Sequence, residues 1–260
     1  MMGKDHIMIS LAWGFLLASP ILIQYPVYFI AFIIGITLGS VYPDIDSSYN
    51  PYGDVSSDDL EEGRGALTAL MRFVAYPAKH LTGFIVSKGN KDVKKEYLEH
   101  RNLMHSILGV VLSLAIILVP LNLIFYFIGY WNLAFFIGTL GVLVGAFMHL
   151  LEDSCTLSGI MYLYPYVKRK LKGNVNVECD STKAGKKFTP IFVVPACVYL
   201  VCDLYLKNQP MLSQFNIIGS LPLWTKLVLM FVVGLLAWIV CFRLAQTNEW
   251  TKQKSNPQHK

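Results

Sequence analysis

The chain has 260 residues, of which 54% are hydrophobic and only 15% charged, and its net charge is +5. A soluble domain carries roughly 25% charged residues, so this composition, with a mean hydropathy of +0.48, excludes an ordinary soluble enzyme. The charges form a few blocks between long apolar runs, so the positive balance favours a membrane topology over a nucleic-acid partner.

Six apolar segments are visible along the chain. They cover residues 7–19, 25–41, 103–127, 133–151, 188–206 and 223–242. A helix that crosses a bilayer needs roughly 20 residues, within a range of about 17–25. The first segment is short, and if the first pair forms a re-entrant hairpin the chain has four spans instead of six. We predict an all-α, polytopic membrane bundle of about six apolar helices.

The first segment resembles a signal peptide, because Lys4 precedes an apolar run. Asp5 and His6 stand where only positive charge is expected, however, and no cleavage pattern precedes Pro20. We therefore expect a retained helix. Of the polar stretches between the helices, the longest contains a semi-apolar piece at 66–86, which we expect to form an interfacial helix.

The orientation follows from the lysine and arginine residues. With six spans, twenty of the 22 basic residues lie on the side that holds both termini, and only Lys207 and Lys226 lie on the other. Basic residues concentrate in cytoplasmic loops. We predict a multi-pass protein of the inner (plasma) membrane, with both termini cytoplasmic.

Four short polar motifs lie at helix ends on this predicted cytoplasmic side. The candidate metal ligands in them are His6, Asp44, Asp46, His100, His105, His149 and Asp153. His149 and Asp153 are four residues apart and share a helix face. Imidazole and carboxylate groups suit zinc, manganese or iron, and seven candidates are enough for one or two divalent ions. Ionisable groups at membrane depth are costly unless paired, which favours a functional site.

Each motif taken alone also has a structural explanation. His6 could be a solvated N-terminal residue, the aspartates could cap a turn, and His149 could simply pair with Asp153. Glu152 lies on a different helix face, as a supporting group or a general base. Ser106 is more typical of a helix-end hydrogen-bonding residue than of a nucleophile. Joint placement of the motifs favours the metal site.

In this order, the motifs resemble the YdjM-like family, inner-membrane proteins described as predicted metal-dependent hydrolases. The resemblance rests on an N-terminal histidine, PDIDS at 43–47, HRxxxHS at 100–106 and HLLEDSCTLSG at 149–159. It covers roughly residues 1–190, leaving 191–260 as a C-terminal helical hairpin and polar tail of the same membrane domain. The family pattern carries over to the seven candidate ligands and to Arg101, Ser106, Thr156 and Gly159. Met104 and Glu152 depart from it, and both changes could alter the surroundings of the ligands.

The resemblance and the cluster together predict a metal-dependent hydrolase at the cytoplasmic face, acting on an ester or phosphoester of a lipid or lipid-linked substrate. Arg101, Glu152 and Ser106 are the candidate catalytic residues, with Arg101 neutralising developing negative charge. The alternatives are a non-catalytic metal-binding membrane protein with a sensing, transport or structural stress-response role, and a metal-free lipid phosphatase. The phosphatase is disfavoured because its PSGH motif is absent.

Overall fold

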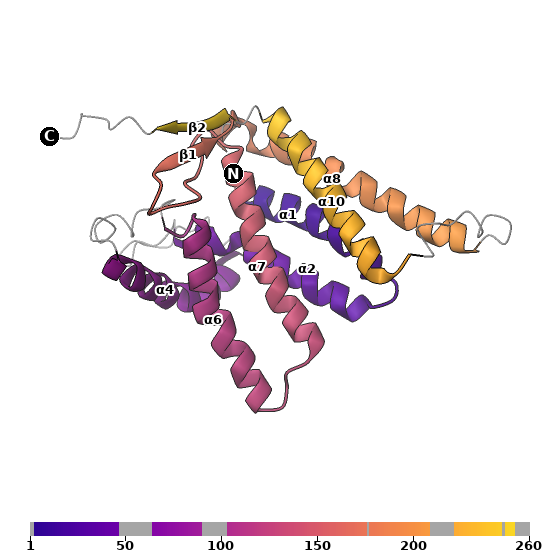
Figure 1. Ribbon diagram of the computed structural model, residues 1–260, viewed down its shortest axis with the longest axis horizontal. Helices are drawn as coiled ribbons and strands as arrows, with labels where there is room; N and C mark the ends of the chain where they lie inside the picture. Colours follow the sequence, from indigo (N-terminus) through magenta and orange to yellow (C-terminus); the bar gives the residue numbers. More distant parts are fainter. Residues whose placement is uncertain are drawn as a thin grey trace.

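The computed structural model describes residues 3–46, 64–89, 103–175, 177–208, 221–245 and 248–252. Its main elements are α1 (Gly3–Ala18), η1 (Ser19–Ile21), α2 (Pro26–Val41), η2 (Tyr42–Asp46), α4 (Arg64–Gly89), α6 (Ile107–Phe127), α7 (Leu133–Ser154), β1 (Arg169–Lys172), α8 (Val177–Asn208), α10 (Leu223–Leu244) and β2 (Asn248–Lys252). In Figure 1, α7 separates α4 and α6 on one side from α8 and α10 on the other.

The predicted helical membrane bundle is confirmed. Five segments of the described chain are long and apolar enough to cross a membrane, in α2, α6, α7, α8 and α10, and α1 is a shorter apolar helix. The sidedness of the termini stays a prediction, as does the division into a bundle and a C-terminal hairpin. The main difference in the helices is α8, which begins at Val177 instead of near residue 188. Hydropathy detects only the apolar part of a helix, so it does not indicate the polar first turns of α8.

Helices α2 and α7 pack closely because glycines face each other where they cross. A Cβ added to Gly39 would lie 2.0 Å from the carbonyl oxygen of Val142, and one added to Gly145 would lie 2.3 Å from that of Ile36. Small residues spaced four apart let membrane helices approach to backbone contact. This contact brings the C-terminal end of α2 against the last turns of α7.

A second hydrophobic core packs α1 against α8 and α10. Ile9, Trp13 and Leu16 of α1 are buried together with Phe192 of α8 and Trp238 of α10. The rings of Phe192 and Trp238 lie 5.4 Å apart between centroids. The first apolar segment, although short, is therefore an internal helix covered by α8 and α10.

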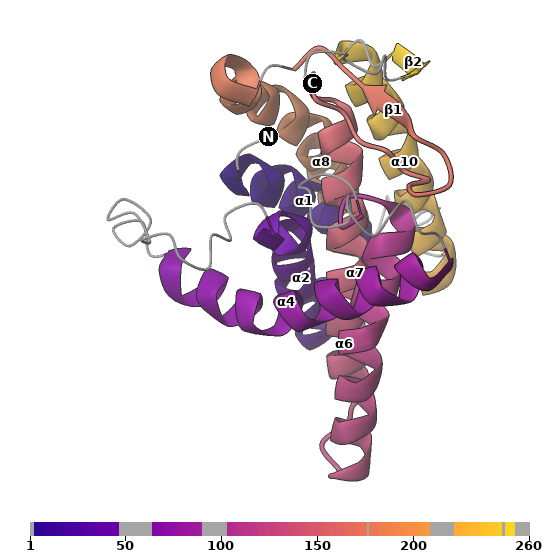
Figure 2. The same ribbon diagram turned by 90° about the vertical axis from the view of Figure 1, so that its left-hand side faces the viewer.

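The predicted helix at 66–86 is present as α4, which is slightly longer than expected. Figure 2 shows that it runs across α6 instead of alongside it. Its outward face is apolar, with Tyr76, Leu81, Phe84 and Ile85 exposed, and the Lys88 ammonium lies 4.6 Å from the centre of the Phe84 ring. An apolar face with a cationic flank is typical of a helix in the membrane interface, where we still expect α4 to lie.

The segment after α7 packs over the N-terminal end of α6 and the C-terminal end of α7. The backbone N–H of Ile107 donates to the Tyr162 carbonyl at 3.0 Å. The Tyr162 hydroxyl donates to the Leu150 carbonyl at 3.3 Å, and burial raises its pKa, so it stays protonated. Further along, β1 pairs antiparallel with β2 in a small sheet that the apolar pattern of the sequence does not predict.

Candidate metal site at the helix ends

Three helix ends from distant parts of the chain converge at one end of the bundle. Asp44 lies on η2 after α2, His105 lies in the turn before α6, and His149 and Asp153 lie in the last turns of α7. Each of these residues offers one ligand atom, and the four atoms all lie within 4.8 Å of one another. They form the candidate metal site of the described chain.

Each histidine of the candidate metal site lies within 3.6 Å of both carboxylates. The Nε2 atom of His105 lies 3.2 Å from Oδ1 of Asp44 and 3.6 Å from Oδ2 of Asp153. The Nε2 atom of His149 lies 3.5 Å from each of the same two oxygens. When an ion is coordinated tetrahedrally with metal–ligand bonds of about 2.0–2.2 Å, its ligand atoms lie about 3.4 Å apart. These spacings therefore fit a single divalent ion.

The hydrogen bond on the far side of the His149 ring fixes the orientation of this ligand. Its Nδ1–H donates to the backbone carbonyl of Ser40 at 2.8 Å, which leaves Nε2 with its lone pair directed into the site. This Nε2 is buried and makes no hydrogen bond to any residue in the described part of the chain. A buried nitrogen of this kind is costly without a partner, and a metal ion would satisfy it.

His6 joins the site from α1. Its Nε2 lies 3.5 Å from Oδ1 of Asp153, and its ring stacks on that of His149 with centroids 4.0 Å apart. Its Nε2 also lacks a hydrogen bond within the described residues. Asp153 thus presents one oxygen to His105 and His149 and the other to His6.

Glu152 holds His6 from the side away from the candidate metal site. Its Oε2 accepts from His6 Nδ1 at 2.5 Å, and its Oε1 accepts from the Ser10 hydroxyl at 2.8 Å. All three side chains are buried. A carboxylate on the remote nitrogen of an imidazole fixes the tautomer and ring orientation of a metal-binding histidine.

The turn before α6 is fixed by its capping residue. The Ser106 hydroxyl donates to the Leu103 carbonyl at 2.7 Å and accepts from the backbone N–H of Gly109 at 3.0 Å. Serine at an N-cap satisfies one of the free amides of the first turn. A Cβ at position 109 would meet the Leu103 carbonyl, so Gly109 permits the tight turn that carries His105.

The last turn of α7 is fixed in a similar way. The Thr156 hydroxyl donates to the Asp153 carbonyl at 2.6 Å, and the Ser154 hydroxyl donates to the Leu151 carbonyl at 2.6 Å. Gly159 has a positive φ of +57° and lies against the Leu171 backbone. These contacts bind the chain after α7 against the helix end that carries Asp153.

The structure thus brings together five of the seven predicted ligands: His6, Asp44, His105, His149 and Asp153. His100 and Arg101 lie outside the described residues, and so does the side chain of Asp46, although the backbone of η2 is described up to it. Ser10 and the Ser40 carbonyl were not predicted, because their contributions depend on helix packing. The glycine spacing in α2 and α7 is the sequence signal that could have indicated the close helix packing behind the contact between His149 and the Ser40 carbonyl.

The four side chains of the candidate metal site differ in exposure. His105, His149 and Asp153 are buried, whereas 24% of the Asp44 side chain is accessible. The open side of the site therefore lies at η2.

Comparison with known proteins gives the family of this chain. The family model described as YdjM inner membrane protein matches residues 1–248. The chain belongs to this YdjM family. The match runs well past residue 190 and includes the sequences of α8 and α10, so it covers more of the chain than the motifs alone indicate. No curated protein and no solved structure matches the chain.

Proposed function

We propose that this YdjM protein is a membrane-embedded, metal-dependent hydrolase whose site lies at the cytoplasmic face and acts on an ester or phosphoester of a lipid-like substrate. The observation that carries the proposal is the set of four imidazole and carboxylate groups with ligand atoms within 4.8 Å. Zinc, manganese and iron all accept such ligands. A membrane-spanning bundle keeps this set at the boundary between lipid and water.

In this proposal Asp44, His105, His149 and Asp153 hold the ion. When bound, the ion supplies a Lewis acid and lowers the pKa of a coordinated water toward neutrality. Because Asp44 is the partly exposed member, substrate and water reach the site past η2. His6, whose Nε2 lies beside Asp153, serves as a further ligand of the same ion or of a second one.

The remaining predicted residues take different roles in this proposal. Glu152 positions His6, since both of its oxygens are already engaged by His6 and Ser10. The Ser106 hydroxyl both donates and accepts a hydrogen bond as the cap of α6. We therefore assign it no nucleophilic role. Asp46 and His100, next to the site in sequence, complete the proposed ligand set. Arg101 neutralises the charge that develops on a phosphoester, as a guanidinium does well.

A non-catalytic metal site is the second candidate, and the burial of three of the four side chains favours it. Structural zinc sites have four protein ligands, whereas catalytic sites keep an open position. In that case the ion would only tie the ends of α2, α6 and α7 together. Both candidates bind the ion, but only the hydrolase turns over a substrate.

The deciding experiment measures metal content and hydrolysis on the same purified protein. Wild type, His105→Ala and the control His80→Ala are prepared in detergent with excess zinc, manganese and iron, and bound metal is counted after desalting. Short-chain chromogenic esters and phosphoesters report turnover. His80 suits the control because it packs against Tyr76 on α4 and contributes no atom to the candidate metal site.

We expect about one ion or more per chain and measurable turnover in wild type and His80→Ala, and loss of both in His105→Ala. Metal with no turnover on any substrate favours the structural site. No stoichiometric metal in wild type contradicts both candidates.

A further inference from the structure

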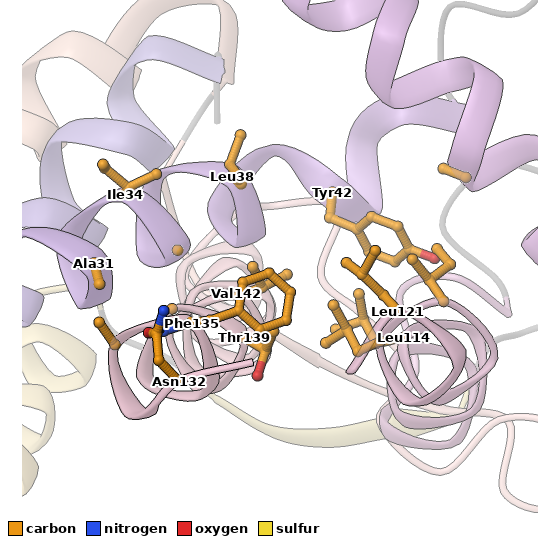
Figure 3. Close-up of a pocket in the computed structure, with 16 residues that line it drawn as sticks. Ala31, Ile34, Leu38, Tyr42, Leu114, Leu121, Asn132, Phe135, Thr139 and Val142 are labelled. Atoms are coloured by element: carbon orange, nitrogen blue, oxygen red, sulfur yellow. The ribbon is translucent and has the colours of Figure 1, made fainter. Parts of the chain in front are cut away.

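A long apolar groove lies between α2, α6 and α7. Its volume is about 500 Å³, within the range of roughly 300–1,000 Å³ that is typical of small-molecule sites. Figure 3 shows Ile34 and Leu38 of α2, Leu114 and Leu121 of α6, and Phe135 and Val142 of α7 around it. Almost all of its lining is hydrocarbon, so its occupant is apolar.

The position of the groove in the bundle specifies the kind of apolar occupant. All three helices are candidate membrane spans, so the medium around the groove is lipid. Along α2 and the first residue of η2 it extends from Ala31 to Tyr42, which at 1.5 Å per residue is about 16 Å. This is roughly half of the 30 Å hydrocarbon core. The groove therefore has the depth of one leaflet, the length that one lipid chain occupies.

The groove points toward the candidate metal site. Tyr42 lines its end and lies two residues before Asp44, the partly exposed member of that site. The helices that line the groove, α2, α6 and α7, are also the ones whose ends carry Asp44, His105, His149 and Asp153. A molecule that lies in the groove has its head at the same helix ends as the site.

The charge at these helix ends indicates the sign of the head. The strand β1 pairs through the Ile160–Leu171 bridge with the segment that follows the C-terminal end of α7, it also contacts α7 itself, and it carries Arg169, Lys170 and Lys172. Basic residues near a membrane surface attract anionic lipid by about 1 kcal/mol each. The polar end of the occupant is therefore anionic.

We propose that the groove binds one hydrocarbon chain of an anionic phospholipid and directs its phosphoester head to the candidate metal site. This substrate assignment rests on the proposed hydrolase function. The reaction consumes one water, whose oxygen bonds to phosphorus while the P–O bond to the leaving alcohol breaks and the alcohol oxygen takes up a proton. Binding of the chain itself requires no turnover and is testable separately.

A matched pair of substitutions on α7 tests the groove. Thr139 lines it, whereas Ile137, two residues earlier, lines a second apolar groove formed with α1, α2 and α10. Thr139→Phe fills the first groove and Ile137→Phe the second, with the same new ring on the same helix. Ala31→Phe fills the first groove from α2 and replaces Thr139→Phe if that variant does not fold.

The full-length protein is reconstituted in vesicles of phosphatidylethanolamine and phosphatidylglycerol, with a trace of phosphatidylglycerol that has a diazirine in mid-chain. After illumination, the labelled peptides are mapped by mass spectrometry. We expect labelling of groove residues such as Leu118 and Leu121 to exceed that of the exposed Leu235 and Leu236 of α10 by about tenfold. Thr139→Phe removes this excess, and Ile137→Phe keeps it.

Equal labelling of the groove and α10, or a groove signal that Thr139→Phe leaves unchanged, overturns the proposal. Metal content and turnover of a short-chain soluble phosphoester are measured on the same samples. If wild type binds no metal and shows no turnover but its groove is still labelled, the proposed function is refuted, whereas binding of the lipid chain in the groove is not. Intact turnover with uniform labelling refutes the groove alone.

Discussion

His149 on α7 donates a hydrogen bond from Nδ1 to the backbone carbonyl of Ser40 on α2, across 2.8 Å. The bond is possible because Gly39 and Gly145 let the two helix backbones touch at this depth. It orients the Nε2 atom of His149 toward Asp44 and Asp153. The packing of two membrane helices therefore determines the orientation of a candidate metal ligand.

Widening the contact between α2 and α7 should disturb the site. In Gly39→Val, the new Cβ would lie 2.0 Å from the Val142 carbonyl oxygen, and overpacking of a core typically costs about 1–3 kcal/mol. We expect a lower free energy of unfolding in detergent and at least tenfold weaker metal binding. In the control Gly138→Ala, the new Cβ would lie 3.4 Å from its nearest neighbour, the Ala31 carbonyl oxygen. The free energy of unfolding and the metal affinity should therefore stay close to wild type. Equal effects of the two variants would contradict this reading.

Loss of the carboxylate behind His6 should weaken metal binding without removing a ligand. Glu152→Ala leaves His6 Nδ1 without its acceptor, and substitution of such supporting groups typically costs about 10–100-fold in affinity. Competition with a fluorescent chelator gives the dissociation constant. Ser10→Ala removes only the hydroxyl that donates to Glu152 and should have a smaller effect. An affinity of Glu152→Ala equal to wild type would show that His6 does not contribute to the site.

Metal removal should destabilise the bundle. Without an ion, the buried Asp153 and the largely buried Asp44 bring two carboxylates together on either side of the His149 imidazole. A ligand present at 100 times its dissociation constant stabilises the folded state by about 2.7 kcal/mol. We expect a chelator to lower Tm in wild type, and zinc to restore it. In His149→Ala the chelator should have no effect, and a shift of the same size there would place the ion elsewhere.

An ion pair far along the chain from the candidate metal site should stabilise the C-terminal hairpin. Lys226 of α10 donates to Asp203 of α8 at 3.1 Å, and both side chains are largely buried. Removing one partner of a buried pair typically costs about 3–5 kcal/mol, because the other charge stays behind. Lys226→Met should lower the free energy of unfolding in detergent by roughly this amount. The double variant with Asp203→Leu should recover most of it, and no recovery would mean that the pair is not the cause.

Much of the fold follows from hydropathy, since a helix in lipid must be apolar along its length. The same helices alternate in direction, which is why His6, Asp44, His105 and Asp153 were expected at one end. The placement of α1 inside the bundle, below Phe192 and Trp238, was not predictable, because it depends on tertiary packing. The pairing of β1 with β2 joins residues far apart in sequence, and no local pattern indicates it.

The candidate site was predictable as a list of residues but not as an arrangement. Residue type and spacing predict that His149 and Asp153 share a helix face. They do not indicate that Glu152, the neighbour of Asp153, contacts His6 and lies outside the four-residue candidate metal site. That distinction depends on the position of α1 against α7. Sequence patterns therefore identify candidate ligands, and packing separates the ligands from the residues that orient them.

Our proposal that these helix ends share one metal ion is tested most directly by X-ray absorption spectroscopy of zinc-loaded protein. A shell of nitrogen and oxygen ligands at about 2.0–2.2 Å, with the multiple scattering of imidazole that decreases in His149→Ala, is the expected result. A sulfur shell at about 2.3 Å would place the ion at cysteines and would contradict this proposal. An imidazole signal that His149→Ala leaves unchanged would contradict it as well.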